Sequence, residues 1–281
     1  MAAVFEGKVA VITGGSRGIG RELAYQLADQ GAWLSLAARG AVRLDSTAAQ
    51  CRKRGGKALA IPTDVGEPSQ CQSLITQTVR EYGRIDMLIN NAGVSAWGKL
   101  EEMHTPTVLE HIMKVNYLGS AYCTFYALPY LKQVRGRIVG VCSLAGKKGL
   151  PALSGYAASK HAMVGFFDAL RVELADYGIS VTMVYPDSVA TESDSPHRGA
   201  DGQASASESN KADGAMSARA CAQLVLQGAA QRRREVITTS RGKILLGLNF
   251  FAPGLVDRIA RKTIEENRMA SEISTQERGE L

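Results

Sequence analysis

The sequence predicts an α/β protein built around one doubly wound, mostly parallel β-sheet with helices on both faces. Two observations predict this fold class: short apolar runs alternate with longer amphipathic segments, and the apolar runs are continuous rather than interrupted by polar residues. Continuous runs of Val, Ile and Leu are typical of strands that helices cover on both sides. The intervening segments are long enough for crossover helices, so we expect a parallel sheet of about seven strands.

The predicted strands follow one another in chain order, with helices expected between them. The first six are "KVAVIT" 8–13, "AWLSLAA" 32–38, "KALAIPTD" 57–64, "IDMLINN" 85–91, "RIVGVCS" 137–143 and "SVTMVYP" 180–186. A shorter run, "EVITT" 235–239, completes the sheet. The first predicted helix, "RELAYQLADQG", begins directly after the first strand and a glycine-rich turn.

The chain divides into one large domain and a short extension. We expect residues 1–240 to form the domain and residues 241–281 to form an amphipathic helical C-terminal extension. Between the sixth and seventh strands, residues 191–217 form a polar tract rich in Ser, Ala, Gly and Asp. A long tract of this composition inside a compact domain is typical of a mobile loop, and we expect it to close over a substrate.

The composition is that of an ordinary globular protein. Apolar residues make up 45% of the chain and charged residues 21%, which excludes wholesale disorder. The five cysteines include no CxxC pair, so neither a zinc knuckle nor a disulfide framework is predicted, and a reducing cytoplasm is the expected setting. No metal site is predicted, because the four histidines lack metal-ligand spacing. They are His104, His111, His161 and His197.

The sequence predicts neither a secretory signal nor a membrane-spanning helix. The amino-terminal run lacks a long apolar core, and the nearest candidate span, 244–256, is shorter than the roughly 20 residues that cross a bilayer. The net charge is +6, and the run "QRRRE" places three arginines together at 232–234. A solvated basic face is one explanation, and attraction of the extension to anionic lipid is another. We expect a cytoplasmic protein, either free or in peripheral contact with a membrane, and no nucleic-acid partner, since basic and aromatic residues do not interleave.

The turn after the first strand reads "TGGSRGIG", 13–20, and leads directly into a predicted helix. The glycines at 14, 18 and 20 let the backbone turn sharply and approach a pyrophosphate, whose charge then faces the helix N-terminus. A strand, a glycine turn and a helix in this order are typical of a Rossmann-type dinucleotide site. The predicted contacts in the turn are Gly14, Ser16, Arg17, Gly18, Ile19 and Gly20.

The end of the second strand predicts which dinucleotide binds. NAD-binding sites of this architecture place a carboxylate about 20 residues after the glycine turn, where it binds the ribose hydroxyl. This chain has "SLAARGAVR" there, with Arg39 and no carboxylate, and Arg17 adds a second guanidinium. Guanidinium groups suit bidentate binding of phosphate, so the sequence favours NADP(H), unless both arginines are ordinary surface residues.

Several further motifs occur in a fixed order along the chain. They are "TGGSRGIG" at 13, "DV" at 64, "NNAG" at 90, "KVNYLG" at 114, "SLAG" at 143 and "YAASK" at 156. Together they resemble the classical short-chain dehydrogenase/reductase family over roughly residues 5–240. The stretches "CSLAGKKG" and "YAASKHAMVGFFDALRVEL" are most similar to the branch of 11β-hydroxysteroid dehydrogenases and 3-ketodihydrosphingosine reductases.

This resemblance implies the roles of individual residues. It implies a catalytic tetrad of Asn116, Ser143, Tyr156 and Lys160. It implies further cofactor contacts through Asp64, Val65, Asn91, Ala92, Gly93, Tyr156, Lys160, Pro186, Val189 and Thr191. One position departs from the family pattern, since Asp187 follows Pro186 where the family usually has glycine, and an aspartate adopts positive φ less readily.

The chemistry of carbonyl reduction explains this set of residue types. Tyr156 and Lys160 lie about one helical turn apart, so their side chains share a face, and a protonated lysine is expected to lower the tyrosine pKa. Ser143 would orient the substrate oxygen, and Asn116 would hold a water that links Lys160 to solvent, as the resemblance implies. Lys147 and Lys148 follow the serine and are expected in a solvated loop.

The sequence therefore predicts an NADP(H)-dependent oxidoreductase that interconverts a ketone or aldehyde with an alcohol. The resemblance favours a bulky hydrophobic substrate, such as a steroid, a long-chain 3-keto compound or an aryl ketone, and a homodimer or homotetramer. One alternative is a non-catalytic NADP(H)-sensing regulator on the same fold, although such proteins usually lose the tyrosine or lysine. Another is a sugar-nucleotide-modifying relative, although the glycine spacing here is TGxxxGxG rather than TGxxGxxG.

Overall fold

A computed structural model describes residues 4–191, 197–198, 204–205 and 215–262. Its centre is a seven-stranded parallel sheet in the order β11-β6-β5-β4-β1-β2-β3. The strands are β1 (Val9–Thr13), β2 (Trp33–Ala38), β3 (Lys57–Pro62), β4 (Met87–Asn90), β5 (Arg137–Val141), β6 (Ser180–Tyr185) and β11 (Glu235–Ile237). The doubly wound, Rossmann-type sheet predicted from the sequence is confirmed.

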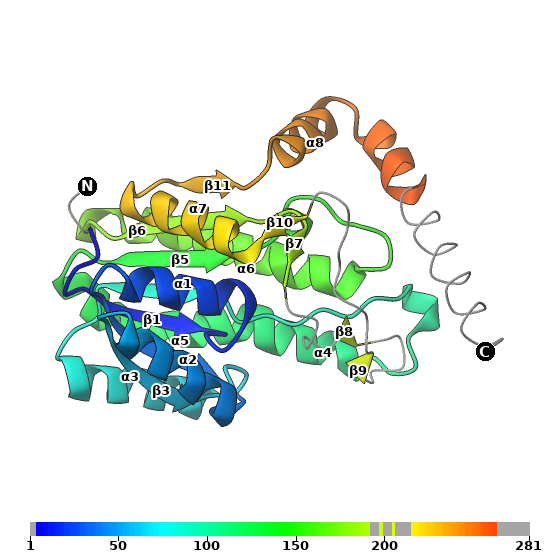
Figure 1. Cartoon of the computed structure of the whole chain (residues 1–281). Coiled ribbons are helices and arrows are strands. Elements are labelled where there is room, and N and C mark those ends of the chain that lie inside the picture. Colours follow the sequence, from blue (N-terminus) through cyan, green and yellow to red (C-terminus); the bar gives the residue numbers. More distant parts are fainter. Residues whose placement is uncertain (1–3, 192–196, 199–203, 206–214, 263–281) are drawn as a thin grey trace.

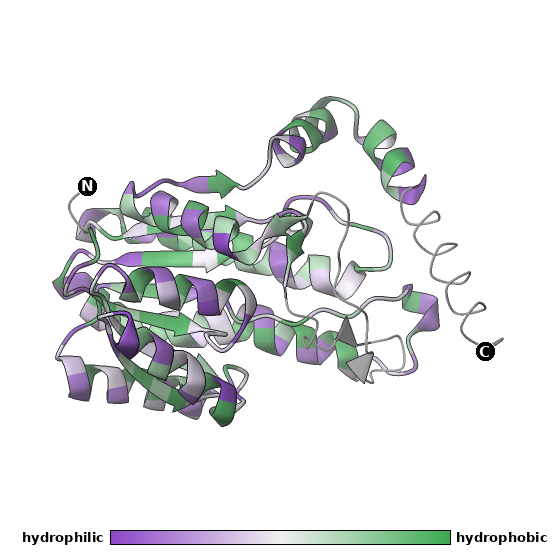
Figure 2. Ribbon diagram, viewed as in Figure 1, coloured by the Kyte–Doolittle hydropathy of each residue, from purple (hydrophilic) through white to green (hydrophobic). Residues whose placement is uncertain are grey.

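Helices cover both faces of the sheet (Figure 1). One face packs against α1 (Gly18–Ala28), α2 (Ala41–Lys53) and α7 (Ala218–Ala230). The other packs against α3 (Pro68–Tyr82), α5 (Gly119–Gln133) and α6 (Ser154–Glu173). Figure 2 shows the result, with hydrophobic strands between helices that are hydrophilic on their outer sides.

The sheet is rigid because its central strands are buried along their whole length. Every residue of β1 and β4 is buried, and Ile12, Leu34 and Leu36 are among the largest side chains with no exposure. Full burial of an aliphatic side chain contributes about 1.5–3 kcal/mol to stability. The core therefore fixes the ends of the strands, where the loops that form a site begin.

Shorter elements lie around the carboxyl ends of the strands. The helix α4 (Thr107–Met113) continues through a π-helical turn, Lys114–Leu118, into α5. The 3₁₀ turns are Leu100–Glu102, Leu144–Gly146 and Ala175–Tyr177. Two further small sheets pair β7 (Val189–Ala190) with β10 (Met216–Ser217), and β8 (His197–Arg198) with β9 (Ala204–Ser205). Most of the predicted loop at 191–217 lies outside the described residues.

The predicted C-terminal helical extension is present as far as the described residues reach. It consists of α8 (Ser240–Phe251) and a helical segment at 253–262, which continue from β11 at one edge of the sheet (Figure 1). Residues 263–281 of the predicted extension lie outside the described part. Within the described ranges, no helix combines the length and the apolar character that a membrane crossing requires.

Candidate active site

A cleft of about 600 Å³ opens at the carboxyl ends of the central strands. It lies where the strand order reverses, since β1 is flanked by β2 on one side and β4 on the other. Ligands of open α/β sheets bind at this switch point. The predicted cofactor residues that line the cleft are Gly14, Ser16, Arg17, Gly18, Ile19, Arg39, Asp64, Val65, Asn91, Ala92, Gly93 and Thr191.

Five predicted cofactor residues do not line this cleft. They are Gly20, Tyr156, Lys160, Pro186 and Val189. Gly20 lies behind the turn, where an added Cβ would collide with the Gly14 carbonyl oxygen and lie 2.5 Å from Asn91 Nδ2. Its role in the structure is therefore to let the turn pack closely, rather than to touch a ligand in the cleft.

The glycine turn has the backbone geometry that its sequence requires. Gly14 and Gly18 have φ of +69° and +52°, in the left-handed region that favours glycine. Asn91, at the end of β4, supports the turn, because its Nδ2 donates to the Thr13 carbonyl at 2.9 Å. The hydroxyl of Thr13 in turn accepts from the backbone N–H groups of Asn91 and Ala92, each at 3.0 Å. This network fixes the relative position of the turn and the floor of the cleft.

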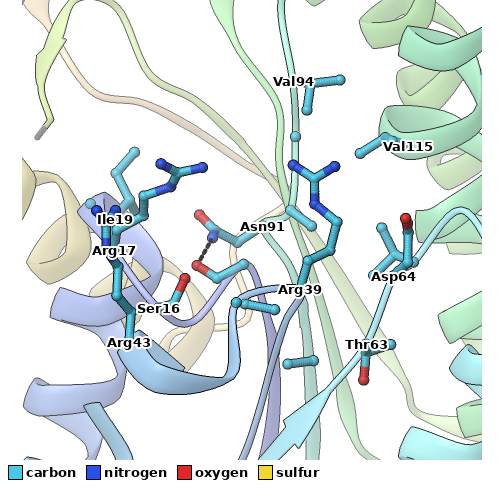
Figure 3. A pocket seen from close by; sticks show the side chains of 18 of the residues that line it. Ser16, Arg17, Ile19, Arg39, Arg43, Thr63, Asp64, Asn91, Val94 and Val115 are labelled. Carbon is cyan, nitrogen blue, oxygen red and sulfur yellow. Dashed lines mark hydrogen bonds between the residues drawn. The ribbon is translucent and has the colours of Figure 1, made fainter. Parts of the chain in front are cut away.

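Three arginines line the cleft, one of which sequence reasoning missed. Arg17 and Arg39 were predicted, and Arg43, in the first turn of α2, joins them. Figure 3 shows Arg17 and Arg43 at the side of the glycine turn and Ser16, while Arg39 extends toward Val94. The stretch "SLAARGAVR" contained the signal, because a helix that begins at residue 41 directs its first turn back toward the cleft.

The predicted tetrad comes together at the ends of β4 and β5. Lys160 is only 3% exposed, and its Nζ donates to the Val141 carbonyl at 3.2 Å. The ring centre of Tyr156 lies 5.7 Å from this nitrogen, and the Ser143 side chain is close enough to the Tyr156 phenol to lower its pKa. An added Cβ on Gly93 would lie 3.3 Å from Asn116 Oδ1 and 3.5 Å from Lys160 Nζ, so both groups border the same backbone.

Asn116 is fully buried and lies in the π-helical turn between α4 and α5. Such turns are rare and frequently mark functional sites. Its Oδ1 accepts from the Val94 N–H at 2.8 Å, while Nδ2 donates to the Val94 carbonyl and to Ser159 Oγ, both at 2.9 Å. Ser159 Oγ donates to the carbonyl of Tyr156 at 2.7 Å. The side chain of Asn116 thus connects the loop after β4 to the helix that carries the tyrosine.

The direction of the Tyr156 pKa differs from the prediction. Burial raises the pKa of Tyr156 to about 12, a nearby Cys142 adds to the rise, and the hydrogen bond to Ser143 opposes it. Burial also lowers the pKa of Lys160. The expected lowering of the tyrosine pKa by Lys160 is therefore wrong for this structure, because both groups lose solvation and the ammonium group is directed at the Val141 carbonyl.

Asp187 does not adopt the positive φ that a glycine would allow. Its carboxylate oxygen Oδ2 instead accepts from Thr239 Oγ1 at 3.0 Å. Thr239 is the N-cap of α8 and also accepts from the Gly242 N–H at 3.0 Å. Asp187, which stands where the family usually has glycine, thus attaches the C-terminal extension to the end of β6.

Lys147 and Lys148 are not in a solvated loop, contrary to the prediction. Lys147 forms an ion pair with Glu235 at 2.7 Å, and its Nζ lies 4.5 Å from the centre of the Tyr185 ring. Lys148 forms an ion pair with Asp257 at 2.6 Å. The loop that follows the predicted catalytic serine is therefore held against the C-terminal extension.

The histidines show no metal site in the described part of the chain. His161 Nδ1 lies 2.8 Å from the Ala157 carbonyl oxygen, and His104 is exposed. Among residues 4–191 and 215–262 no His, Cys, Asp and Glu side chains gather into a group that could hold a metal ion. The side chain of His197 lies outside the described residues.

Comparison with known proteins places these features among dehydrogenases. Residues 8–201 match the family model described as short chain dehydrogenase. The chain is 36% identical over 251 residues to 11-beta-hydroxysteroid dehydrogenase-like 4A of Arabidopsis thaliana, covering 89% of this chain and 82% of that protein. It is 33% identical over 258 residues to 11-beta-hydroxysteroid dehydrogenase 1A of the same plant, covering 89% and 74%.

Solved structures show the same similarity. A short-chain dehydrogenase/reductase from Burkholderia phymatum in complex with NAD has a TM-score of 0.79 and 29% identity, covering 89% of this chain and 95% of that one. An alcohol dehydrogenase from the archaeon Thermococcus sibiricus, complexed with 5-hydroxy-NADP, has a TM-score of 0.73 and 26% identity, covering 83% and 96%.

Proposed function

The chain belongs to the short-chain dehydrogenase family, and we propose that it reduces a ketone or aldehyde to an alcohol, reversibly, with NADP(H). The observation that carries this proposal is the convergence of Ser143, Tyr156 and Lys160 beside the nucleotide cleft. A family member of this fold binds a nicotinamide cofactor and a small-molecule substrate. The choice of NADP(H) and the role of each residue are the proposed parts.

The cleft fits a dinucleotide with an additional phosphate. Its glycine turn lets the backbone approach a pyrophosphate, and three arginines that can bind phosphate line the same cleft. The end of β2 provides no carboxylate that would repel a 2'-phosphate. One similar structure holds NAD and another 5-hydroxy-NADP, so the arginines of this chain are the support for NADP(H).

The side chains of the tetrad can supply the proton that carbonyl reduction needs. When bound, the nicotinamide supplies the hydride. The Ser143 hydroxyl lies near the Tyr156 phenol and would hold the substrate oxygen next to it. With a pKa of about 12, the phenol is protonated at neutral pH and can donate its proton as negative charge develops on the substrate oxygen. The protonated phenol is the form that carbonyl reduction requires.

Lys160 and Asn116 act behind the tyrosine in this proposal. Lys160 is buried beside Tyr156 and can return a proton to the phenolate. Asn116 holds Val94 and α6 in place through its three hydrogen bonds. The water that it would hold, as the resemblance implies, stays a prediction.

A bulky hydrophobic substrate is the class that we propose. The relatives named 11-beta-hydroxysteroid dehydrogenase-like support this class. Four expectations from the sequence stay predictions: the division of the chain at residue 240, the substrate loop at 191–217, the homo-oligomer and the cytoplasmic location.

A regulator that binds NADP(H) without turnover is less well supported than an enzyme, because Tyr156 and Lys160 are both retained and lie near Ser143.

A substrate screen tests the proposal. NADPH oxidation would be followed with steroids, long-chain 3-keto compounds, aryl ketones and small sugars as the four substrate classes. We expect turnover with at least one bulky apolar ketone and weaker turnover with NADH in place of NADPH. A preference for a small polar sugar would contradict the substrate class, and absence of turnover with tight NADPH binding would favour the sensor.

A further inference from the structure

The described part of the C-terminal extension exposes large apolar side chains. Phe250 and Phe251 are 81% and 84% exposed, Ile244 is 70% exposed and Leu255 is 47% exposed. Figure 2 shows the hydrophobic character of α8 and of the helical segment that follows it. Soluble proteins rarely group exposed apolar side chains in this way unless the surface contacts a partner or a membrane.

These side chains are not the ones that attach the extension to the domain. Gly242 is buried against Leu144, and Val256 is 1% exposed. Ile244 and Phe251 lie two helical turns apart, so they share one face of α8, which is not the face that carries the buried Gly242. The extension therefore has one face that packs on the domain and a second apolar face that the described residues leave uncovered.

Basic side chains accompany the exposed apolar face. Residues 240–262 contain five Lys and Arg and one acidic residue, Asp257. Asp257 forms an ion pair with Lys148, which belongs to the domain. Arg241, Lys243 and Arg258 are exposed along the segment. Arg241 precedes Ile244 by one turn, and Lys243 precedes Phe250 by two turns, so positive charge borders the apolar face.

We propose that this face, formed by Arg241, Lys243, Ile244, Phe250, Phe251, Leu255 and Arg258, docks on an anionic membrane surface. A helix with exposed Phe and Ile on one side and basic residues beside them lies in the interface, with its apolar side chains among the acyl chains and its charges at the headgroups. The described helices are too short or too polar to cross the bilayer, which agrees with docking in the plane of the surface.

A second copy of the chain fits this face less well than lipid does. In a two-fold contact the same surface meets itself, so Arg241, Lys243 and Arg258 would approach their own counterparts. The exposed acidic partners that such a contact needs are absent from the described residues of the segment, where Asp257 is already paired. Anionic headgroups complement these charges without that conflict.

Two contacts give the face a fixed orientation on the protein. The Thr239 hydroxyl donates to Asp187 at the start of α8, and Lys148 pairs with Asp257 in the next helical segment. The extension is therefore held at two points rather than attached by its first residue alone. A pre-ordered apolar face loses less conformational freedom when it binds a surface.

Cosedimentation of the full chain with vesicles tests the proposal, and it requires no enzymatic activity. The vesicles are phosphatidylcholine alone and phosphatidylcholine with phosphatidylserine. We expect the wild type to bind the anionic vesicles more strongly, and Phe250→Ser/Phe251→Ser to weaken that binding by about tenfold or more, because two aromatic rings no longer enter the bilayer. Val172→Ser, which changes an exposed apolar residue of α6, is the matched control and should bind as the wild type does.

Charge reversal provides an independent arm should the aromatic variant fail to fold. Arg241→Glu/Lys243→Glu should abolish the preference for phosphatidylserine, whereas Lys53→Glu/Arg80→Glu, on α2 and α3 at the other edge of the sheet, should keep it. Equal binding of the wild type to both kinds of vesicle would overturn the proposal. The proposal would also be overturned if, without lipid, the wild type formed a larger oligomer than the aromatic variant does. The face would then be a contact between copies of the chain.

Discussion

The Lys160 ammonium nitrogen lies 5.7 Å from the centre of the Tyr156 ring and donates to the carbonyl of Val141. Both side chains come from α6, where Lys160 is buried and Tyr156 is half-buried. Burial therefore decides the protonation of the tyrosine, which keeps its proton at neutral pH. The protonated Tyr156 phenol can donate a proton to the substrate oxygen, as carbonyl reduction requires.

The raised pKa of Tyr156 can be measured by titrating the protein without cofactor. Burial places this pKa at about 12, above the ordinary value of 10.0. We expect the difference in phenolate absorbance between the wild type and Tyr156→Phe to develop as the pH approaches about 12. The unfolded chain releases this proton first, so the contribution of the phenol to stability declines as the pH rises from 10.0 toward about 12. A difference signal that titrates below 10.0 would show that charge from Lys160 outweighs burial.

Removal of the cleft arginines should weaken NADPH binding more than NADH binding. A guanidinium that binds a 2'-phosphate makes charge-assisted hydrogen bonds, so we expect Arg17→Ala, Arg39→Ala or Arg43→Ala to raise the NADPH dissociation constant by about 10-fold to 100-fold. NADH binding should change little, and Arg80→Ala on α3 is the control. Equal or tighter binding of NADH by the wild type would contradict NADP(H) preference.

The close packing of the glycine turn predicts opposite effects for two glycine substitutions. In Gly20→Ala the new methyl group would meet the Gly14 carbonyl, and the change should cost about 1–3 kcal/mol of stability and weaken nucleotide binding. Gly165→Ala, in the middle of α6, meets nothing within 4 Å and should stabilise the protein by about 0.5–1 kcal/mol. Urea denaturation measures both, and a neutral Gly20→Ala would contradict the geometry of the turn.

The hydrogen bond between Asp187 and Thr239 should be visible as energetic coupling. We expect the effects of Asp187→Ala and Thr239→Val on the free energy of unfolding to be non-additive by about 1 kcal/mol, because each change alone removes the same interaction. Thr239→Ser keeps a hydroxyl and should retain most of the coupling. Additive effects would mean that this contact does not hold the extension.

The fold and the positions of most site residues followed from local patterns in the sequence. The seven parallel strands were predictable because buried strands are continuous apolar runs, and the glycine turn because only glycine tolerates the φ at Gly14 and Gly18. Tyr156 and Lys160 share a face because helical periodicity places them there.

The features that the sequence did not predict depend on the tertiary structure. Arg43 enters the cleft because α2 begins where it does, and Lys148 pairs with Asp257 across a large separation in the chain. The pKa of Tyr156 depends on how completely the packed protein excludes water, and a motif of residue types carries no such information.

The most direct test of the proposed mechanism is the turnover of Tyr156→Phe with the best ketone from the substrate screen. The change removes one oxygen, so we expect the NADPH dissociation constant to stay near the wild-type value while kcat falls by about 10²-fold to 10⁴-fold or more. Tyr177→Phe, at an exposed tyrosine outside the site, should leave kcat unchanged. Reduction by Tyr156→Phe at near the wild-type rate would contradict the assignment of Tyr156 as the proton donor.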